Sequence, residues 1–234
     1  MRYRWILFDA DGTLFDFERS SAVALRSAVE QHGGEFDEQR HLTDYRAINA
    51  RYWHALERGE IDQQVLRVAR FRDFLTGAAM PHVDAAAFSA AYEGHLAEGR
   101  HLIDGAAALL ARLHGRASMR IVTNGLRAVQ RPRLGGSSVA HHFCDLLISE
   151  ELGVSKPDPR VFEIAFERMG APPRDQVLMV GDSLAADIRG GAAFGIETCW
   201  FNPRGAGRDP AVAPTHEIRS LGELLAICLG EAAS

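Results

Sequence analysis

One stretch near the amino terminus, residues 5–16, constrains the fold more than any other part of the chain. It opens with four consecutive apolar residues, a run typical of a short strand buried on both faces in a parallel sheet. Two carboxylates one residue apart, Asp9 and Asp11, follow this run directly and lead into Gly12. A carboxylate at the end of a buried strand is costly unless a metal ion or another cation compensates its charge. The stretch therefore predicts an α/β fold with a ligand site at the carboxyl end of this strand.

Length and composition narrow the class of protein. A chain of 234 residues with 47% hydrophobic content can bury one full core and a smaller second one, so we expect one or two domains. The net charge of −5 argues against a nucleic-acid polymer as partner. The first apolar run ends at Asp9 and no run is long enough to span a bilayer, so we expect neither a secretory signal nor a membrane partner. The three cysteines form no Cys-x-x-Cys pair, which favours reduced thiols and a cytoplasmic location.

Residues 17–99 have the periodicity of helices, with no strand-like alternation between them. Apolar residues recur at helical spacing around 22–29, 42–56, 65–75 and 84–96. Asp84 is suited to cap the last of these helices. The aromatic residues of the second helix, including Tyr45, Tyr52 and Trp53, favour a bundle core rather than a base-stacking platform.

From about residue 104 onward, strands alternate with helices, which indicates a doubly wound parallel sheet of the Rossmann-like type. One strand, 119–122, ends in Thr123-Asn124-Gly125. Another, 177–180, is followed by Gly181-Asp182-Ser183 and, within the first turns of the next helix, by Asp187. A strand at 197–201 and a last helix at 221–229 finish the sheet. Together with Asp9 and Asp11, Asp182 makes an oxygen-rich site of the kind that Mg²⁺ prefers.

Lys156 is the only lysine among 26 lysines and arginines. It lies on a loop just before a helix for which Asp158 is a good N-cap and Pro159 a suitable first residue. An isolated lysine is usually a solvated surface charge. Because this is the only lysine of the chain and it is held between a turn and a proline, a functional role is favoured.

The region 127–142 departs from the expected pattern. Pro132 lacks a backbone donor, and the run Gly135–Ser138 interrupts the periodicity, so we predict a short or kinked helix followed by a mobile loop. The effect of this departure on the turn at Thr123-Asn124-Gly125 is left open. Three arginines of the region are interpreted as a solvated charged face rather than as guides for an anionic substrate: Arg127, Arg131 and Arg133.

Taken in order, the Asp-x-Asp-Gly-Thr-Leu run at 9–14, Thr123-Asn124, Lys156-Pro157 and Gly181-Asp182 resemble the four motifs of the haloacid dehalogenase (HAD) superfamily, which consists mostly of phosphatases. The resemblance implies an α/β core formed by residues 1–16 and 100–234 and an inserted helical-bundle cap formed by residues 17–99. Stretches between the motifs, 47–74, 146–166 and 177–202, are similar to bacterial house-cleaning pyrimidine 5'-nucleotidases. Those enzymes hydrolyse nucleoside monophosphates, including damaged pyrimidine forms.

The resemblance also implies roles for individual residues. Asp9 would be the nucleophile, and Asp11 would be the general acid and base. Mg²⁺ would bind Asp9, Asp182 and the backbone carbonyl of Asp11, with Asp187 orienting this shell directly or through water.

The substrate's phosphate group has its own implied partners. By the same resemblance, Thr123, Asn124 and Lys156 would hold it. The expected activity is thus Mg²⁺-dependent hydrolysis of nucleoside 5'-monophosphates, pyrimidine preferred, through an aspartyl-phosphate intermediate.

Three other functions stay open on the sequence. A phosphoglycolate or sugar-phosphate phosphatase would share the whole core and differ only in the cap. A metal-free 2-haloacid dehalogenase would share the nucleophile but would need neither an acid at Asp11 nor a metal ligand at Asp182. A non-catalytic binding scaffold would be expected to have lost one of these groups. The preferred base, the cap residues that select the substrate, and the choice between monomer and homodimer are not set by the sequence.

Overall fold

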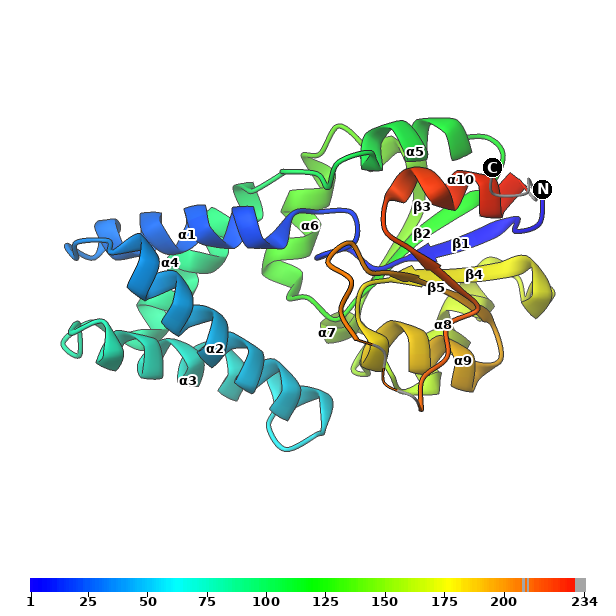
Figure 1. The fold of residues 1–234 in the computed structure, drawn as a ribbon. Coiled ribbons are helices and arrows are strands. Elements are labelled where there is room, and N and C mark those ends of the chain that lie inside the picture. Colours follow the sequence, from blue (N-terminus) through cyan, green and yellow to red (C-terminus); the bar gives the residue numbers. More distant parts are fainter. Residues whose placement is uncertain (208, 210, 230–234) are drawn as a thin grey trace. The chain divides into compact units, whose positions relative to one another are not determined.

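The structure is a computed structural model that describes residues 1–207, 209 and 211–229. It divides into two compact units (Figure 1). Unit 1 comprises Met1–Phe17, His101–Arg127 and Leu134–Ser234, and unit 2 comprises Glu18–Arg100 and Ala128–Arg133. None of the helices within the described residues has the length and apolar character needed to cross a membrane.

Unit 1 is built on a parallel sheet of six strands in the order β3-β2-β1-β4-β5-β6. The strands are β1 (Trp5–Phe8), β2 (Ser118–Thr123), β3 (Phe143–Ile148), β4 (Val177–Gly181), β5 (Glu197–Phe201) and β6 (His216–Ile218). Because β1 lies in the middle and the chain winds outward from it in both directions, the predicted doubly wound α/β fold is confirmed. The sequence analysis did not identify β3 and β6, because Cys144 and Asp145 interrupt the apolar run of β3 and β6 has only three residues.

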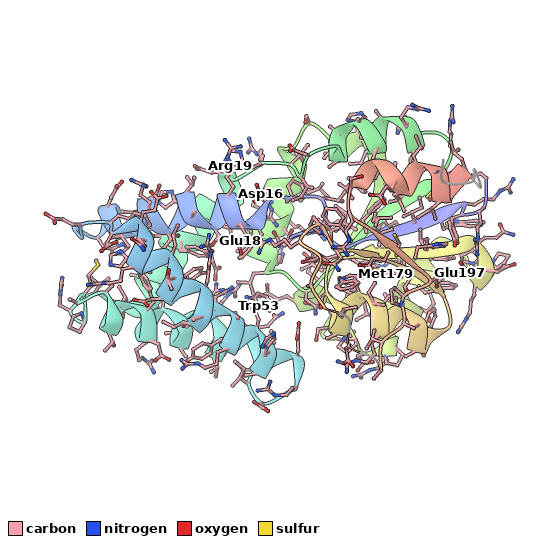
Figure 2. The ribbon with its side chains drawn as sticks, in the orientation of Figure 1. Asp16, Glu18, Arg19, Trp53, Met179 and Glu197 are labelled. Carbon is pink, nitrogen blue, oxygen red and sulfur yellow. The ribbon has the colours of Figure 1, made fainter. Side chains whose placement is uncertain are left out.

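Helices cover both faces of this sheet (Figure 1). Successive strand residues point to opposite faces. Ile6 of β1 therefore belongs to the core under α5 (Ala106–Leu113) and α10 (Leu221–Leu229), whereas Leu7 belongs to the core under α8 (Pro159–Met169) and α9 (Gly190–Phe194). Met179 of β4, labelled in Figure 2, packs in the second of these cores. This double covering explains why the central strands are continuously apolar.

Shorter elements complete unit 1. These are α7 (Ser149–Leu152), η1 (Ala140–His142), η2 (Arg174–Gln176) and η3 (Leu184–Arg189), the last with π-helical geometry. The helix α6 (Arg127–Gly135), most of which belongs to unit 2, contains Pro132 and is nine residues long, so the short helix predicted here is present. The interpretation of Arg133 as a solvated charge is wrong, because its side chain is buried and donates to Gln130 at 3.0 Å.

Unit 2 contains the helices α1 (Phe17–Gln31), α2 (Glu38–Glu57), α3 (Gln63–Gly77) and α4 (Ala85–Glu98), together with residues 128–133 of α6. Asp37, Asp62 and Asp84 each accept a hydrogen bond from a backbone N–H of the first turn of α2, α3 and α4, so each of these helices begins at an aspartate cap.

The core of unit 2 is aromatic. Tyr45 stacks on Phe71 with ring centroids 5.7 Å apart, and both rings are buried. Phe74, Phe88 and Tyr92 are buried beside them. The expected aromatic core is therefore present, although most of it comes from α3 and α4: Tyr52 and Trp53 of α2 are only half-buried.

Candidate active site

The parallel register brings the predicted site residues of unit 1 to one edge of the sheet. Phe8 at the end of β1 is level with Ile121 of β2 on one side and with Val180 of β4 on the other. The residues that follow, Asp9, Thr123 and Asp182, therefore come from three adjacent strand ends. Glu197, labelled in Figure 2, begins β5 and lies at the opposite end of the strands, where their amino termini are.

Lys156 lies between two of the predicted carboxylates. Its Nζ is 2.6 Å from Asp9 Oδ1 and 2.6 Å from Asp187 Oδ1. The side chains of Lys156 and Asp187 are each 1% exposed, and Asp9 as a residue is 8% exposed. Lys156 is thus a buried counter-ion rather than a surface charge, and it connects the loop before α8 with β1 and η3.

The charges in this cluster perturb one another. Burial alone lowers the pKa of Lys156, but the neighbouring carboxylates of Asp187 and Asp9 outweigh burial, so its pKa is raised and the ammonium is held charged. Burial raises the pKa of Asp9 well above its ordinary value; Lys156 opposes that shift, and the charges of Asp187 and Asp182 add to it. One ammonium therefore faces an excess of carboxylate charge.

Asp182 is the third carboxylate of the cluster. Although its side chain reaches solvent, the protein packed around its carboxyl group and then the charge of Asp187 raise its pKa to about 7. Thr13 Oγ1 donates to Asp182 Oδ1 at 3.3 Å, and Trp200 Nε1 donates to the Asp182 carbonyl at 2.9 Å. Gly12 has a left-handed φ of 82°, and a Cβ built on it would lie 2.4 Å from Asp182 Oδ2, so this turn requires glycine.

The carboxylates fit a divalent cation. Asp9, Asp182 and Asp187 each offer one oxygen within 4.8 Å of the others, and no other group of three histidine, cysteine or acidic side chains in the described part of the chain does so. An all-oxygen donor set with an excess of negative charge suits Mg²⁺. Asp187 also accepts from the Ser183 backbone N–H at 3.0 Å and from Lys156, which fixes the position of its carboxylate.

Thr123 and Asn124 lie at the end of β2, on the same edge of the sheet. Thr123 is 2% exposed, and its Oγ1 accepts from the Gly125 N–H at 3.0 Å. The Asn124 side chain donates to the Lys156 carbonyl and accepts from the Lys156 N–H, both at 2.8 Å. The amide of Asn124 thus holds the backbone of the residue that carries the ammonium. Its contact with a phosphate group, like that of Thr123, stays a prediction.

We expect Asn124→Ala to lower both the free energy of unfolding and kcat. Two hydrogen bonds to a buried segment are lost, at about 0.5–1.5 kcal/mol each. The Lys156 ammonium also loses its fixed position. Asn202 offers a control, because its amide pairs with the Ala206 backbone in the same way, at 3.0 and 2.9 Å, and also donates to Glu217 Oε1 at 2.8 Å. Asn202→Ala should therefore cost at least as much stability in chemical denaturation and leave kcat nearly unchanged; equal kcat losses in both variants would contradict the role of Asn124.

Asp11 follows Asp9 by two residues and is half-buried. It lies in a tight turn, in which the Leu14 N–H donates to the Ala10 carbonyl at 3.0 Å and Asp11 pairs with Phe15 in a β-bridge. Its role in proton transfer stays a prediction.

Sequence reasoning missed two contacts of the site, the hydrogen bond from Thr13 to Asp182 and the pairing of Asn124 with Lys156. Thr13 stands directly after Gly12 in the first motif, and this proximity was the only available signal. Nothing in the spacing of Asn124 and Lys156, which are 32 residues apart, indicates that the Asn124 side chain meets the Lys156 backbone.

Comparisons with known proteins agree with this geometry. A family model described as haloacid dehalogenase-like hydrolase matches residues 3–195. Pyrimidine 5'-nucleotidase YjjG of Escherichia coli is 36% identical, covering 96% of this chain and 97% of its own, and pyrimidine 5'-nucleotidase PynA of Streptococcus pneumoniae is 34% identical, covering 96% and 94%. The solved structure of HAD-hydrolase YfnB of Bacillus subtilis, bound to magnesium, superposes with a TM-score of 0.92 at 37% identity, over 97% of this chain and 99% of that one.

Proposed function

The chain belongs to the haloacid dehalogenase-like hydrolase family, and we propose that it is a Mg²⁺-dependent phosphatase that hydrolyses nucleoside 5'-monophosphates with a preference for pyrimidine bases. The observation that carries the proposal is the buried Lys156, bonded to Asp9 and Asp187 beside the Asp182 carboxylate. Two relatives that match nearly the full chain are named pyrimidine 5'-nucleotidases, which supports the substrate class.

In the proposed reaction Asp9 attacks the phosphorus of the substrate. A bond forms between a carboxylate oxygen and phosphorus while the bond to the nucleoside oxygen breaks, which gives an aspartyl phosphate. Lys156 reduces the repulsion between the carboxylate and the phosphate oxygens, because its ammonium is already in place against Asp9. Thr123 and the backbone amides after it would bind the phosphate oxygens.

Proton transfer is assigned to Asp11. In the first step its carboxyl group gives a proton to the departing nucleoside oxygen. In the second step the resulting carboxylate takes a proton from water while that water attacks phosphorus, which releases phosphate and restores both Asp9 and Asp11. The two aspartates therefore return to their starting protonation states in each cycle.

The metal would be held by Asp9, Asp182 and the Asp11 carbonyl. When bound, Mg²⁺ supplies positive charge that neutralises the phosphate oxygens. Asp187 is already held by Lys156 and by the Ser183 N–H, so we assign it to orienting this site. We further propose that residues 17–99 form a cap domain that selects the substrate.

The first test removes the metal. We expect hydrolysis of p-nitrophenyl phosphate to be lost in EDTA and restored by excess Mg²⁺, because the carboxylates then face an anionic substrate with only one cation among them. Full activity in EDTA would contradict the metal assignment and favour the metal-free dehalogenase, which a halide-release assay on 2-chloropropionate would then detect. No turnover of either substrate under any metal condition would favour the binding scaffold.

The second test compares substrates. UMP and dTMP should have higher kcat/KM than phosphoglycolate or a hexose phosphate, measured as phosphate release at saturating Mg²⁺. A clear advantage for phosphoglycolate or a hexose phosphate would contradict the nucleotidase assignment and leave the phosphatase assignment in place.

A further inference from the structure

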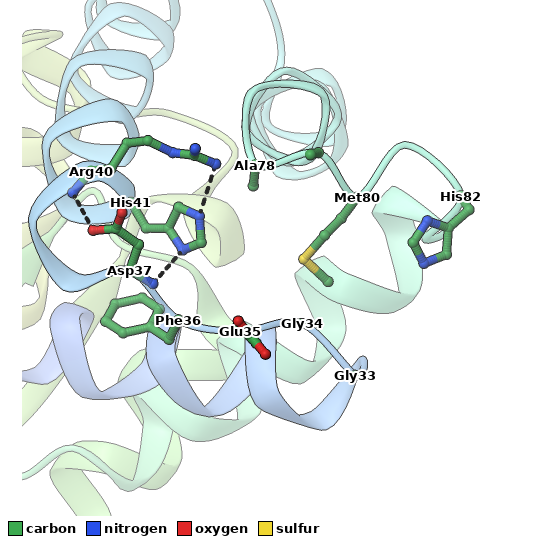
Figure 3. Close-up of a pocket in the computed structure, with 11 residues that line it drawn as sticks. Gly33, Gly34, Glu35, Phe36, Asp37, Arg40, His41, Ala78, Met80 and His82 are labelled. Carbon is green, nitrogen blue, oxygen red and sulfur yellow. Dashed lines mark hydrogen bonds between the residues drawn. The ribbon is translucent and has the colours of Figure 1, made fainter.

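Unit 2 contains a pocket of about 440 Å³ (Figure 3). Two segments line it, the connection from α1 into α2 at residues 33–37 and the connection from α3 to α4 at residues 78–82. Arg40 and His41 of the first turn of α2 complete the wall. All of these residues belong to one unit, so the pocket is a property of the helical bundle itself.

His41 is the unusual residue in this wall. It is 2% exposed, and its ring packs edge-on against Phe36 and Phe74, with centroids 5.5 and 5.6 Å apart. Its Nδ1 accepts the Asp37 backbone N–H at 3.3 Å, as Figure 3 shows. An Nδ1 that accepts a hydrogen bond carries no proton, so the proton of the neutral ring is on Nε2.

The Nε2–H faces a second donor. Its neighbour is Arg40 Nη2 at 3.5 Å, which also donates to the Gly77 carbonyl at 3.4 Å, and a guanidinium has no acceptor atom. The other tautomer would accept from Arg40 but would place its own proton against the Asp37 N–H. In either tautomer the ring lacks one acceptor, and no other described residue hydrogen-bonds to it. A buried donor without an acceptor is costly.

We propose that this pocket binds a small oxyanion group, a phosphate or a carboxylate, through His41 Nε2–H and the Arg40 guanidinium. One acceptor oxygen can lie at about 2.9 Å from both nitrogens when these are 3.5 Å apart. The group lies beside the amino terminus of the 20-residue helix α2, whose dipole favours negative charge. This site is separate from the one proposed for catalysis, because none of its residues comes from unit 1.

Other charged groups of the pocket determine which ligands fit. The Asp37 carboxylate is engaged as the cap of α2, accepting from the Arg40 N–H at 3.0 Å. Glu35 is exposed, lines the pocket and makes no hydrogen bond with a described residue, so it repels an incoming anion. Burial and then the charge of Arg40 lower the pKa of His41, which keeps the ring neutral at pH 7 and leaves Arg40 as the cation. The site therefore suits a single oxyanion group rather than a polyanion.

The test uses the full chain with ¹⁵N-labelled histidine, in EDTA, titrated separately with inorganic phosphate and with acetate. The His41 signals are assigned by their loss in His41→Phe. We expect the Nε2 resonance of His41 to shift on titration. Arg40→Gln should weaken binding roughly 10- to 100-fold, since a charge-assisted hydrogen bond is lost. Glu35→Gln should tighten it. Arg72→Gln, which removes an exposed arginine from the neighbouring helix α3, should leave it unchanged.

The outcomes separate the possibilities. A shift with phosphate alone assigns the site to phosphate-bearing ligands, and a shift with acetate as well assigns it to carboxylates in addition. An Nε2 resonance that responds to neither anion, or a response of equal affinity in Arg40→Gln, overturns the proposal and leaves water as the acceptor. Because the readout is the His41 ring in unit 2, phosphate bound at the catalytic edge of unit 1 does not imitate a positive result.

Discussion

Lys156→Arg is expected to lower kcat by about 10² or more, the loss typical of removing one preorganised electrostatic donor. The Lys156 Nζ is 2.6 Å from one oxygen of Asp9 and 2.6 Å from one oxygen of Asp187. The Lys156 side chain is only 1% exposed. A guanidinium is wider and planar, and it binds a carboxylate through two parallel hydrogen bonds. It cannot occupy the position of a compact ammonium between two carboxylates without displacing one of them. The kcat of the purified variant on UMP measures the effect.

The burial of Lys156 also changes what is expected for stability. Replacing a lysine on an exposed loop would have little effect on stability. Disturbing a buried ion pair leaves a buried carboxylate without a cation beside it, which destabilises the folded state. We therefore expect a lower Tm as well. Val161→Ala serves as the control, because it removes buried packing from α8 without touching a charge. If Val161→Ala lowers Tm comparably and keeps its kcat, the kcat loss in Lys156→Arg comes from the missing ammonium and not from lower stability. A Lys156→Arg variant with normal kcat would show that Lys156 has no part in the mechanism.

The sequence was sufficient to predict the strand ends, because burial on both faces requires apolar runs and any carboxylate after such a run stands out. Asp9 and Asp182 were found in this way, and the structure places them directly after two adjacent strands, β1 and β4. The burial of Lys156 could not be predicted from the sequence, because a loop residue belongs to no periodic pattern from which burial can be inferred. Its partner Asp187 was predicted only to orient a metal, because a helical position does not indicate which side chain lies opposite.

The helical unit shows the same limit. Its caps at Asp37, Asp62 and Asp84 are local contacts, of which the sequence analysis proposed only Asp84. His41 was overlooked because an apolar stripe is read from apolar residues, and a histidine enclosed by Phe36 and Phe74 adds nothing to that pattern. The burial of His41 depends in part on Phe74 of another helix, and spacing along the chain does not indicate such a contact.

Asp9→Asn and Asp11→Asn should both impair turnover, but in different ways. An amide at position 9 can still accept from Lys156, yet it is a poor nucleophile toward phosphorus, so turnover should be abolished on every phosphate ester. Asp11→Asn keeps the nucleophile and loses proton transfer, so we expect kcat to fall by roughly 10²- to 10⁴-fold on nucleotides. The loss should be smallest on p-nitrophenyl phosphate, because p-nitrophenolate leaves without needing a proton.

The ratio of the two substrates identifies the role of Asp11. A carboxylate that only shaped the turn between Ala10 and Leu14, or only repelled the substrate, would change both substrates by the same factor. Asp175→Asn is the matched control, because it removes an exposed carboxylate in η2, just before the amino-terminal end of β4, and it should leave both rates unchanged. Equal losses on UMP and p-nitrophenyl phosphate in Asp11→Asn would exclude Asp11 as the acid of the first step. If Asp11→Asn loses more kcat on UMP than on p-nitrophenyl phosphate, and Asp9→Asn is inactive on both, then Asp9 is the nucleophile and Asp11 is the acid.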